Sequence, residues 1–163
     1  MESTESRMKQ NSTAKEKSLH PEASARSSHQ KIVAAEDLDQ RILAAVDAAS
    51  EKKALNIVVL DLREIASFTD YFVITSGTNE RQVQAISDEI YETLKKAGST
   101  AARVEGYKTA EWILLDYGDF IVHVFEEKSR RFYDLERLWR ESKRVDLPTD
   151  IQSGDPGSLR RES

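Results

Sequence analysis

The sequence predicts an α/β fold: a single domain in which a mixed β-sheet of about five strands is flanked by helices. Two kinds of segment lead to this prediction. Short continuous apolar runs have the length of buried strands, and other stretches repeat apolar residues every three or four positions, as helices do. The segments follow in the order α-β-β-α-β-β-β-α, and helices packed on a sheet bury the apolar side of each. The domain is expected to span residues 35–147.

The first half of the domain combines two helices with two strands. Apolar residues recur at helical spacing from Leu38 to Ala49. Residues 56–62 and 71–75 are continuous apolar runs, which is typical of strands covered on both faces. The second helix follows the turn at residues 76–79 and is the most clearly patterned segment of the chain.

The ends of that helix carry capping signals. Asn79, followed three residues later by Gln82, resembles a capping box, and Gly98 supplies the stop. Three short strands are expected next, at residues 101–105, 111–116 and 120–125. Tyr117-Gly118 is a hairpin signal between the last two. A final helix is expected over residues 131–142, with four apolar residues facing inward: Phe132, Leu135, Leu138 and Trp139.

The two ends of the chain are expected to lie outside the fold. Residues 1–34 form the predicted disordered N-terminal arm, in which Met8 and Leu19 are the only large apolar side chains between Met1 and residue 32. Such a segment buries too little surface to offset the entropy of ordering it. Its glutamates argue against an organelle transit peptide. Residues 148–163 contain two glycines and two prolines and are expected to be a flexible tail.

Composition excludes several classes of function. The 163 residues include no cysteine, which rules out disulfides, thiolate metal sites and cysteine nucleophiles. The formal net charge of −5 disfavours sequence-independent nucleic-acid binding over a broad surface but leaves a local basic patch open. No apolar run approaches the roughly 18 residues that cross a bilayer, and no secretory signal pattern begins the chain. A cytoplasmic protein is expected.

The candidate functional residues gather around the predicted hairpin turn. Trp112, Asp116 and Asp119 surround it, and His123 lies beyond on the second strand. This combination suits a metal site for phosphoryl transfer, or a surface that binds another macromolecule. The two alternatives belong to different functional classes.

The metal alternative would make the chain a metal-dependent nucleotidyltransferase with Asp61, Asp116 and Asp119 as ligands. The turn at residues 76–79 would offer backbone amides to a phosphate. However, the Asp-x-Asp pair usual for that chemistry is absent, and the chain contains no P-loop. The other two histidines lie in the arm, so His123 has no partner for a metal site. We therefore expect the three acids to cap turns and strand ends, and His123 to be structural.

Binding is favoured over catalysis. The aromatic residues near the predicted sheet edge are Tyr107, Trp112, Tyr117 and Tyr133. Aromatics mixed with acids form either part of the core or a hot spot for a partner rich in Arg and Lys.

A separate concentration of basic residues runs from Lys128 to Arg144, with Arg137, Arg140 and Arg144 expected on one helical face. It indicates either a solvated surface or a contact with an RNA backbone.

Four segments together resemble one known family. They are DYFVITSGTNERQVQAISDEI (70–90), VEGY (104–107), EWILLDYGDFIVHVF (111–125) and SRRFYDLERLW (129–139). In this order they are similar to the ribosomal silencing factor family (RsfS, also called Iojap-like), over about residues 36–142. The combination is far more specific than any single piece.

The resemblance implies a non-enzymatic regulator of translation without a metal or other cofactor. Members of the family bind the large ribosomal subunit through its fourteenth protein, on the face that meets the small subunit, and sterically block subunit joining when nutrients fall. Their fold resembles nucleotidyltransferases but lacks the catalytic acids. Family members also self-associate, so a homodimer is a further option, and the basic residues noted above leave a minor contact with ribosomal RNA open. Carried over by motif, the partner-binding residues are Glu105, Trp112, Asp116, Tyr117, Asp119, His123 and Tyr133.

Overall fold

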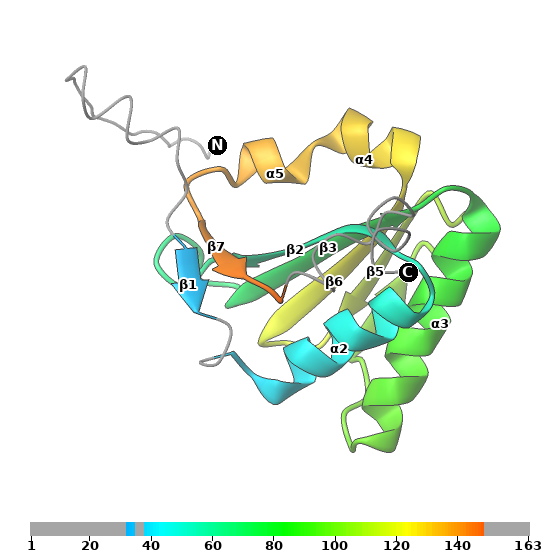
Figure 1. The fold of residues 1–163 in the computed structure, drawn as a ribbon, viewed down its shortest axis with the longest axis horizontal. Helices are drawn as coiled ribbons and strands as arrows, with labels where there is room; N and C mark the ends of the chain where they lie inside the picture. Colours follow the sequence, from blue (N-terminus) through cyan, green and yellow to red (C-terminus); the bar gives the residue numbers. More distant parts are fainter. Residues whose placement is uncertain (1–31, 35–37, 149–163) are drawn as a thin grey trace. The chain divides into compact units, whose positions relative to one another are not determined.

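The computed structural model describes residues 32–34 and 38–148, which form a seven-stranded sheet with helices on both faces (Figure 1). The rest of the expected arm and tail lies outside the described residues. The elements are β1 (Ile32–Ala34), α2 (Gln40–Glu51), β2 (Leu55–Asp61), β3 (Tyr71–Gly77), α3 (Glu80–Lys96), β4 (Arg103–Glu105), β5 (Trp112–Asp116), β6 (Phe120–Glu126), α4 (Glu127–Tyr133), α5 (Leu135–Leu138) and β7 (Lys143–Asp146). No helix among the described residues has the length and apolarity needed to cross a membrane.

The sheet is mixed, as predicted, with strand order β1-β7-β2-β3-β6-β5-β4. Antiparallel pairs join β2 to β3 and β5 to β6, whereas β3 and β6 run parallel because α3 and the short β4 and β5 lie between them in sequence. The hairpin expected at Tyr117-Gly118 is therefore confirmed. Two strands exceed the expected five. β1, within the expected arm, pairs in parallel with β7, and β7 pairs with β2.

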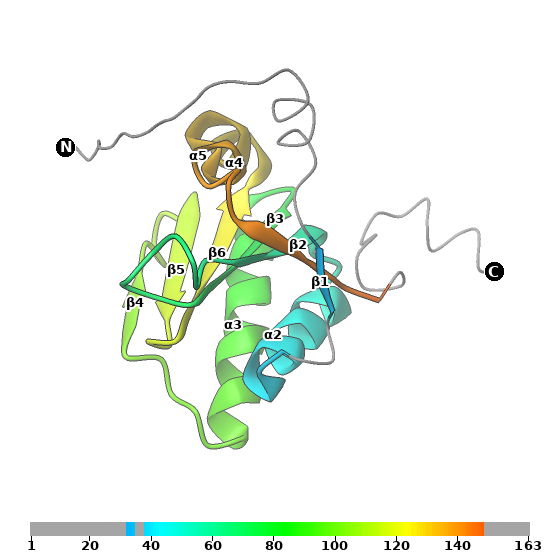
Figure 2. The same cartoon turned by 90° about the vertical axis from the view of Figure 1, so that its left-hand side faces the viewer.

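Helices α2 and α3 cover one face of the sheet, and α4 and α5 lie over the other (Figure 2). The alternation of side chains along each strand separates two apolar clusters. We call the face under α2 and α3 the helix face; there Ile42 and Val46 of α2 pack with Ile86 and Ile90 of α3. We call the other the open face. Its cluster includes Leu60, Phe72, Ile121, Phe125 and Leu135.

The caps of α3 match the expected signals. The Asn79 side chain accepts a hydrogen bond from Gln82 N at 2.8 Å. The Gln82 side chain accepts in return from Thr78 N at 2.7 Å, one residue earlier than in a standard capping box. Its amide nitrogen also donates to the carbonyl oxygens of Lys52 and Lys53, at the end of α2. The cap therefore links the two helices of the helix face.

The single helix expected at residues 131–142 is wrong. Asp134 has a left-handed backbone (φ 51°) and separates α4 from α5. The 3.6-residue repeat therefore does not continue from one helix into the next. Phe132 and Leu138, expected inside, are 79% and 71% exposed. Leu135 is buried as expected. Arg144, expected on the same helix, belongs to β7.

Candidate functional site

A row of aromatic rings crosses the open face. We call it the aromatic row and define it by six side chains in sequential contact: Tyr133, Trp112, His123, Phe72, Trp139 and Phe68. Successive ring centroids lie 4.7, 5.8, 4.4, 5.8 and 5.9 Å apart. Its ends are exposed and its middle is buried, because Tyr133 and Phe68 reach solvent whereas His123 and Phe72 lie inside. The row thus joins the core to a surface.

Strand register explains why these rings meet. Trp112 of β5 lies opposite Phe125 of β6, and His123 lies between Leu114 of β5 and Ile74 of β3. Residues two apart on a strand share a face, so the even-numbered positions of β5 and the odd-numbered positions of β6 all project to the open face. The Trp112 and Phe125 rings therefore meet, with centroids 4.9 Å apart and planes tilted by 31°.

Trp112 is fixed by a hydrogen bond as well as by packing. Its indole Nε1 donates to Nδ1 of His123 at 3.0 Å. Burial lowers the pKa of His123 to about 3, so the imidazole is neutral near pH 7, and accepting at Nδ1 places its proton on Nε2. Nε2 has no hydrogen-bond partner among the described residues. The imidazole instead meets the Phe72 ring edge-on at 4.4 Å, an aromatic contact that orients the ring.

Gly106 brings the chain close to the backbone of Trp112. Its φ of +80° lies in the left-handed region, and a Cβ there would stand 2.1 Å from the Trp112 carbonyl oxygen. Only glycine fits such an approach. The Gly106 carbonyl in turn accepts from Ala110 N at 2.9 Å, closing the loop between β4 and β5.

Two carboxylates lie on the same face as Trp112, farther along β4 and β5. Pairing of β4 with β5 sets Glu105 opposite Leu114 and Arg103 opposite Asp116, so all four project to the open face. Arg103 approaches both acids, at 3.3 Å from Glu105 and 3.4 Å from Asp116. One exposed guanidinium therefore stands among two carboxylates, and the end of the aromatic row near β4 is acidic.

Tyr117 and Asp119 lie on the opposite side of the sheet. Tyr117 is buried on the helix face, where it stacks on Phe120 at 4.9 Å. Burial raises the pKa of Tyr117 to about 12, and its hydroxyl has no hydrogen-bond partner among the described residues. Asp119 is exposed and accepts a 3.0 Å hydrogen bond from Arg41 of α2. Of the seven expected partner-binding residues, five thus project to the open face or its rim: Glu105, Trp112, Asp116, His123 and Tyr133.

Arg130 holds α4 and α5 against the sheet. Its guanidinium is only 11% exposed and makes two bonds to the Glu136 carboxylate, at 3.1 and 3.0 Å. It also donates to the Leu55 carbonyl and the Ser76 hydroxyl at the ends of β2 and β3. Tyr133, one turn beyond Arg130 on α4, is thereby placed on Trp112.

The three acids of the metal alternative do not converge. Asp61 lies on β2, facing the helix side, and its carboxylate accepts two bonds from the Arg63 guanidinium, at 3.0 and 2.8 Å. Asp116 projects to the open face, and Asp119 pairs with Arg41. Within residues 32–34 and 38–148, no group of three His, Cys, Asp or Glu side chains could hold a metal ion.

Sequence reasoning missed part of the exposed apolar surface. Phe68 lies in the loop after β2, and Phe132 and Leu138 lie on α4 and α5. The last two were expected inside a longer helix. The signal for Phe68 was weak, because a single aromatic in a loop carries no periodicity.

Comparison with known proteins identifies the family. The family model described as "Ribosomal silencing factor during starvation" matches residues 35–162. Ribosomal silencing factor RsfS of Halalkalibacterium halodurans is 42% identical over 103 residues, covering 63% of this chain and 88% of that protein. Mouse "Mitochondrial assembly of ribosomal large subunit protein 1" is 31% identical over 97 residues, covering 58% of this chain and 42% of that protein.

A solved structure shares the fold. The crystal structure of a protein from Chromobacterium violaceum matches with a TM-score of 0.61 at 31% sequence identity, covering 68% of this chain and 88% of that one. Fold, motifs and overall similarity agree. The chain belongs to the ribosomal silencing factor family.

Proposed function

We propose that this protein represses translation under nutrient limitation by binding the large ribosomal subunit through its fourteenth protein and sterically blocking the small subunit. The observation that carries the proposal is the pair of Trp112 and Tyr133 at one end of the aromatic row, on the same face of the sheet as the carboxylates of Glu105 and Asp116. The mechanism requires occupancy of a surface and no chemical step.

The geometry suits a protein partner. Because the indole N–H of Trp112 is already bonded inward to His123, the exposed part of the ring presents apolar surface without an unpaired donor. Aromatic anchors held in one rotamer lose little entropy on binding. Trp and Tyr at the centre of an interface are the side chains that most often dominate its free energy.

The flanking acids favour a basic partner. Arg103 separates Glu105 and Asp116 in the free protein and is more than half exposed, so it is free to turn outward. Arg or Lys side chains of a ribosomal protein would then meet both carboxylates, in charge-assisted hydrogen bonds. The names of the bacterial and mouse relatives support a ribosomal partner.

The nucleotidyltransferase alternative is not favoured, because Asp116 lies on the opposite face of the sheet from Asp61 and Asp119, and each of the three pairs with a different arginine. Incubation with labelled nucleoside triphosphates and Mg²⁺ remains the direct check. Turnover that disappears in Asp116→Asn would favour the enzyme.

Sedimentation of the protein with ribosomes tests the proposal. We expect it to comigrate with large subunits in a sucrose gradient and to lower the peak of joined ribosomes. Trp112→Ala should weaken binding by at least about 30-fold, as for a hot-spot residue. The matched control is Tyr91→Ala, in α3 on the other side of the sheet, which should bind normally. Comigration with small subunits, or no shift at all, would contradict the proposal.

A further inference from the structure

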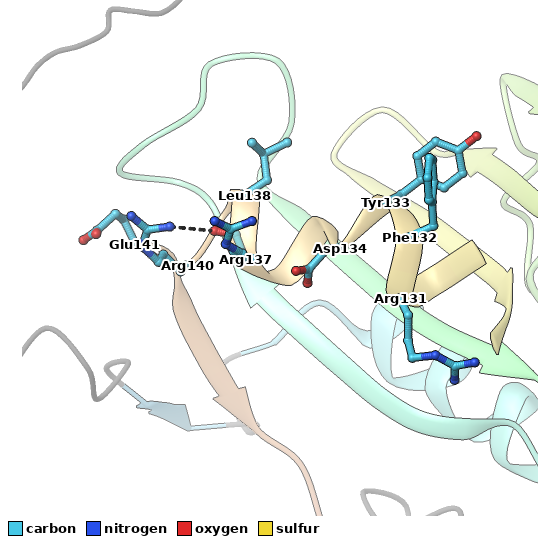
Figure 3. A pocket seen from close by; sticks show the side chains of 8 residues that line it. All are labelled: Arg131, Phe132, Tyr133, Asp134, Arg137, Leu138, Arg140 and Glu141. Carbon is cyan, nitrogen blue, oxygen red and sulfur yellow. Dashed lines mark hydrogen bonds between the residues drawn. The ribbon is translucent and has the colours of Figure 1, made fainter. Parts of the chain in front are cut away.

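A groove on α4 and α5 continues the exposed surface away from the acidic end. It has a volume of about 580 Å³ and is lined by Arg131, Phe132, Tyr133, Arg137, Leu138 and Arg140 (Figure 3). Tyr133 belongs both to this groove and to the aromatic row, since its ring lies 4.7 Å from Trp112. The two regions are therefore parts of one surface.

The groove is basic at both ends. Arg131 extends from one end, and Arg137 and Arg140 stand at the other (Figure 3). Within residues 38–148, the guanidiniums of Arg131 and Arg137 form no ion pair, whereas Arg41, Arg63, Arg103 and Arg130 are all paired with carboxylates. Unpaired guanidiniums on a chain of net charge −5 are available to an anionic partner.

An exposed aromatic ring lies beside these cations. Phe132 is 79% exposed and meets Tyr133 edge-on at 5.0 Å, so its outer face is open. A ring of this kind stacks on an unpaired base, while neighbouring guanidiniums bind phosphates. Asp134 and Glu141 also line the groove, which argues against a purely anionic ligand such as an acidic peptide. A carboxylate between phosphate sites suits a ribose 2′-hydroxyl or a base amino group, which are donors.

We propose that this groove binds RNA of the large subunit, with an exposed base on Phe132 and phosphates at Arg131 and Arg137. The surface of the protein is then polarised: its β4 end meets a basic protein, and its α4–α5 end meets the RNA next to that protein. This inference rests on the proposed function and adds a second class of partner to it.

The salt dependence of binding to purified large subunits tests the inference. Removing one guanidinium that binds a phosphate should lower the slope of log K against log salt concentration by about 0.7 to 0.9. We expect Arg131→Gln with Arg137→Gln to lower the slope by roughly 1.5 and to weaken binding several-fold. The control, Lys95→Gln with Lys96→Gln in the last turn of α3, removes the same charge from the other side of the sheet and should leave the slope unchanged.

Ultraviolet cross-linking distinguishes RNA from a protein ligand. A nucleotide adduct should appear on the peptide that contains Phe132 and be absent in Phe132→Leu, which keeps an apolar side chain without a ring. An equal slope in the arginine variant, or cross-links from this peptide to ribosomal protein alone, would overturn the inference while leaving the proposed function intact. If the unchanged protein fails to bind large subunits, both are overturned.

Discussion

The indole of Trp112 and the imidazole of His123 form one unit, in which Nε1 of the tryptophan donates to Nδ1 of the histidine at 3.0 Å. The histidine is neutral and nearly inaccessible, and its other nitrogen has no hydrogen-bond partner within the described part of the chain. It therefore acts on a partner only through Trp112. Its role is to hold the half-buried Trp112 in one orientation.

Removal of the acceptor should loosen the anchor. His123→Phe keeps an aromatic ring but leaves the buried indole N–H without an acceptor, at a cost of about 1–3 kcal/mol. We expect affinity for large subunits to fall roughly tenfold, since about 1.4 kcal/mol corresponds to that factor, and the indole ¹H–¹⁵N signal of Trp112 to shift and broaden.

His123→Asn is the matched variant, because its side-chain oxygen takes the place of Nδ1. It should restore the indole signal and much of the affinity, although the smaller side chain leaves a cavity. An unchanged indole signal in His123→Phe would show that packing alone positions Trp112.

The buried imidazole should make stability depend on pH. Burial lowers the pKa of His123 from 6.5 to about 3. Between these values the unfolded chain binds a proton at His123 and the folded chain does not, so the free energy of unfolding falls as pH is lowered below 6.5. Above pH 6.5 His123 is neutral in both states and costs no stability. Between pH 6.5 and about 3 the free energy of unfolding falls by about 1.4 kcal/mol for each pH unit.

Urea denaturation at about pH 7.5 and about pH 5 measures the effect. The loss of stability between the two should be about 2 kcal/mol larger for the unchanged protein than for His123→Phe. Comparing the pair cancels every other titrating group. Equal losses in the two proteins would mean that the imidazole is accessible to protons in the folded state.

A methyl group at Gly106 should displace the backbone of Trp112. Gly106 and Gly118 have similar left-handed backbones, with φ of +80° and +85°, so alanine costs about 1–2 kcal/mol of backbone strain at either position. At Gly106 the new Cβ would also meet the Trp112 carbonyl at 2.1 Å, whereas nothing lies within 4 Å at Gly118.

We therefore expect Gly106→Ala to lose at least about 3 kcal/mol of stability and Gly118→Ala about 1 kcal/mol. Thermal or urea denaturation of both variants decides the matter. Equal costs would show that the loop between β4 and β5 adjusts freely.

Long, buried elements could be predicted from the sequence, because their patterns are strong. The strands β2 and β3, the helix α3 and the β5–β6 hairpin lie where apolar runs, periodicity and turn residues indicated. The three- and four-residue strands β1 and β7 could not be predicted, since so short a segment has no periodicity. Their pairing depends on distant partners, such as Arg144 with Leu60.

The break between α4 and α5 has a local cause that sequence spacing did not reveal. An aspartate tolerates the left-handed backbone better than most residues, and at Asp134 this backbone ends α4 before α5 begins.

The sequence also sufficed to predict part of the candidate site. Alternation from Trp112 along β5 already places Tyr117 on the opposite face, and the structure buries it there. The contact of Trp112 with Tyr133 required the tertiary fold.

The ion pair of Arg130 should support the binding surface from beneath. Arg130→Met keeps the bulk of the side chain but removes the bonds to Glu136, Leu55 and Ser76. Because the Glu136 carboxylate left without its partner is 34% exposed, water solvates it in part, and the loss should be about 1–2 kcal/mol. Because α4 and α5 bury few side chains of their own, we expect their amide hydrogens in the Arg130→Met variant to exchange faster than those of α3. Affinity for large subunits should also fall, since Tyr133 is no longer held on Trp112.

The control is the neighbouring Arg131→Met, which removes an exposed guanidinium of the same helix and should change stability by less than about 0.5 kcal/mol. If the two variants are equally stable and exchange alike, α4 and α5 are held by their apolar contacts rather than by Arg130.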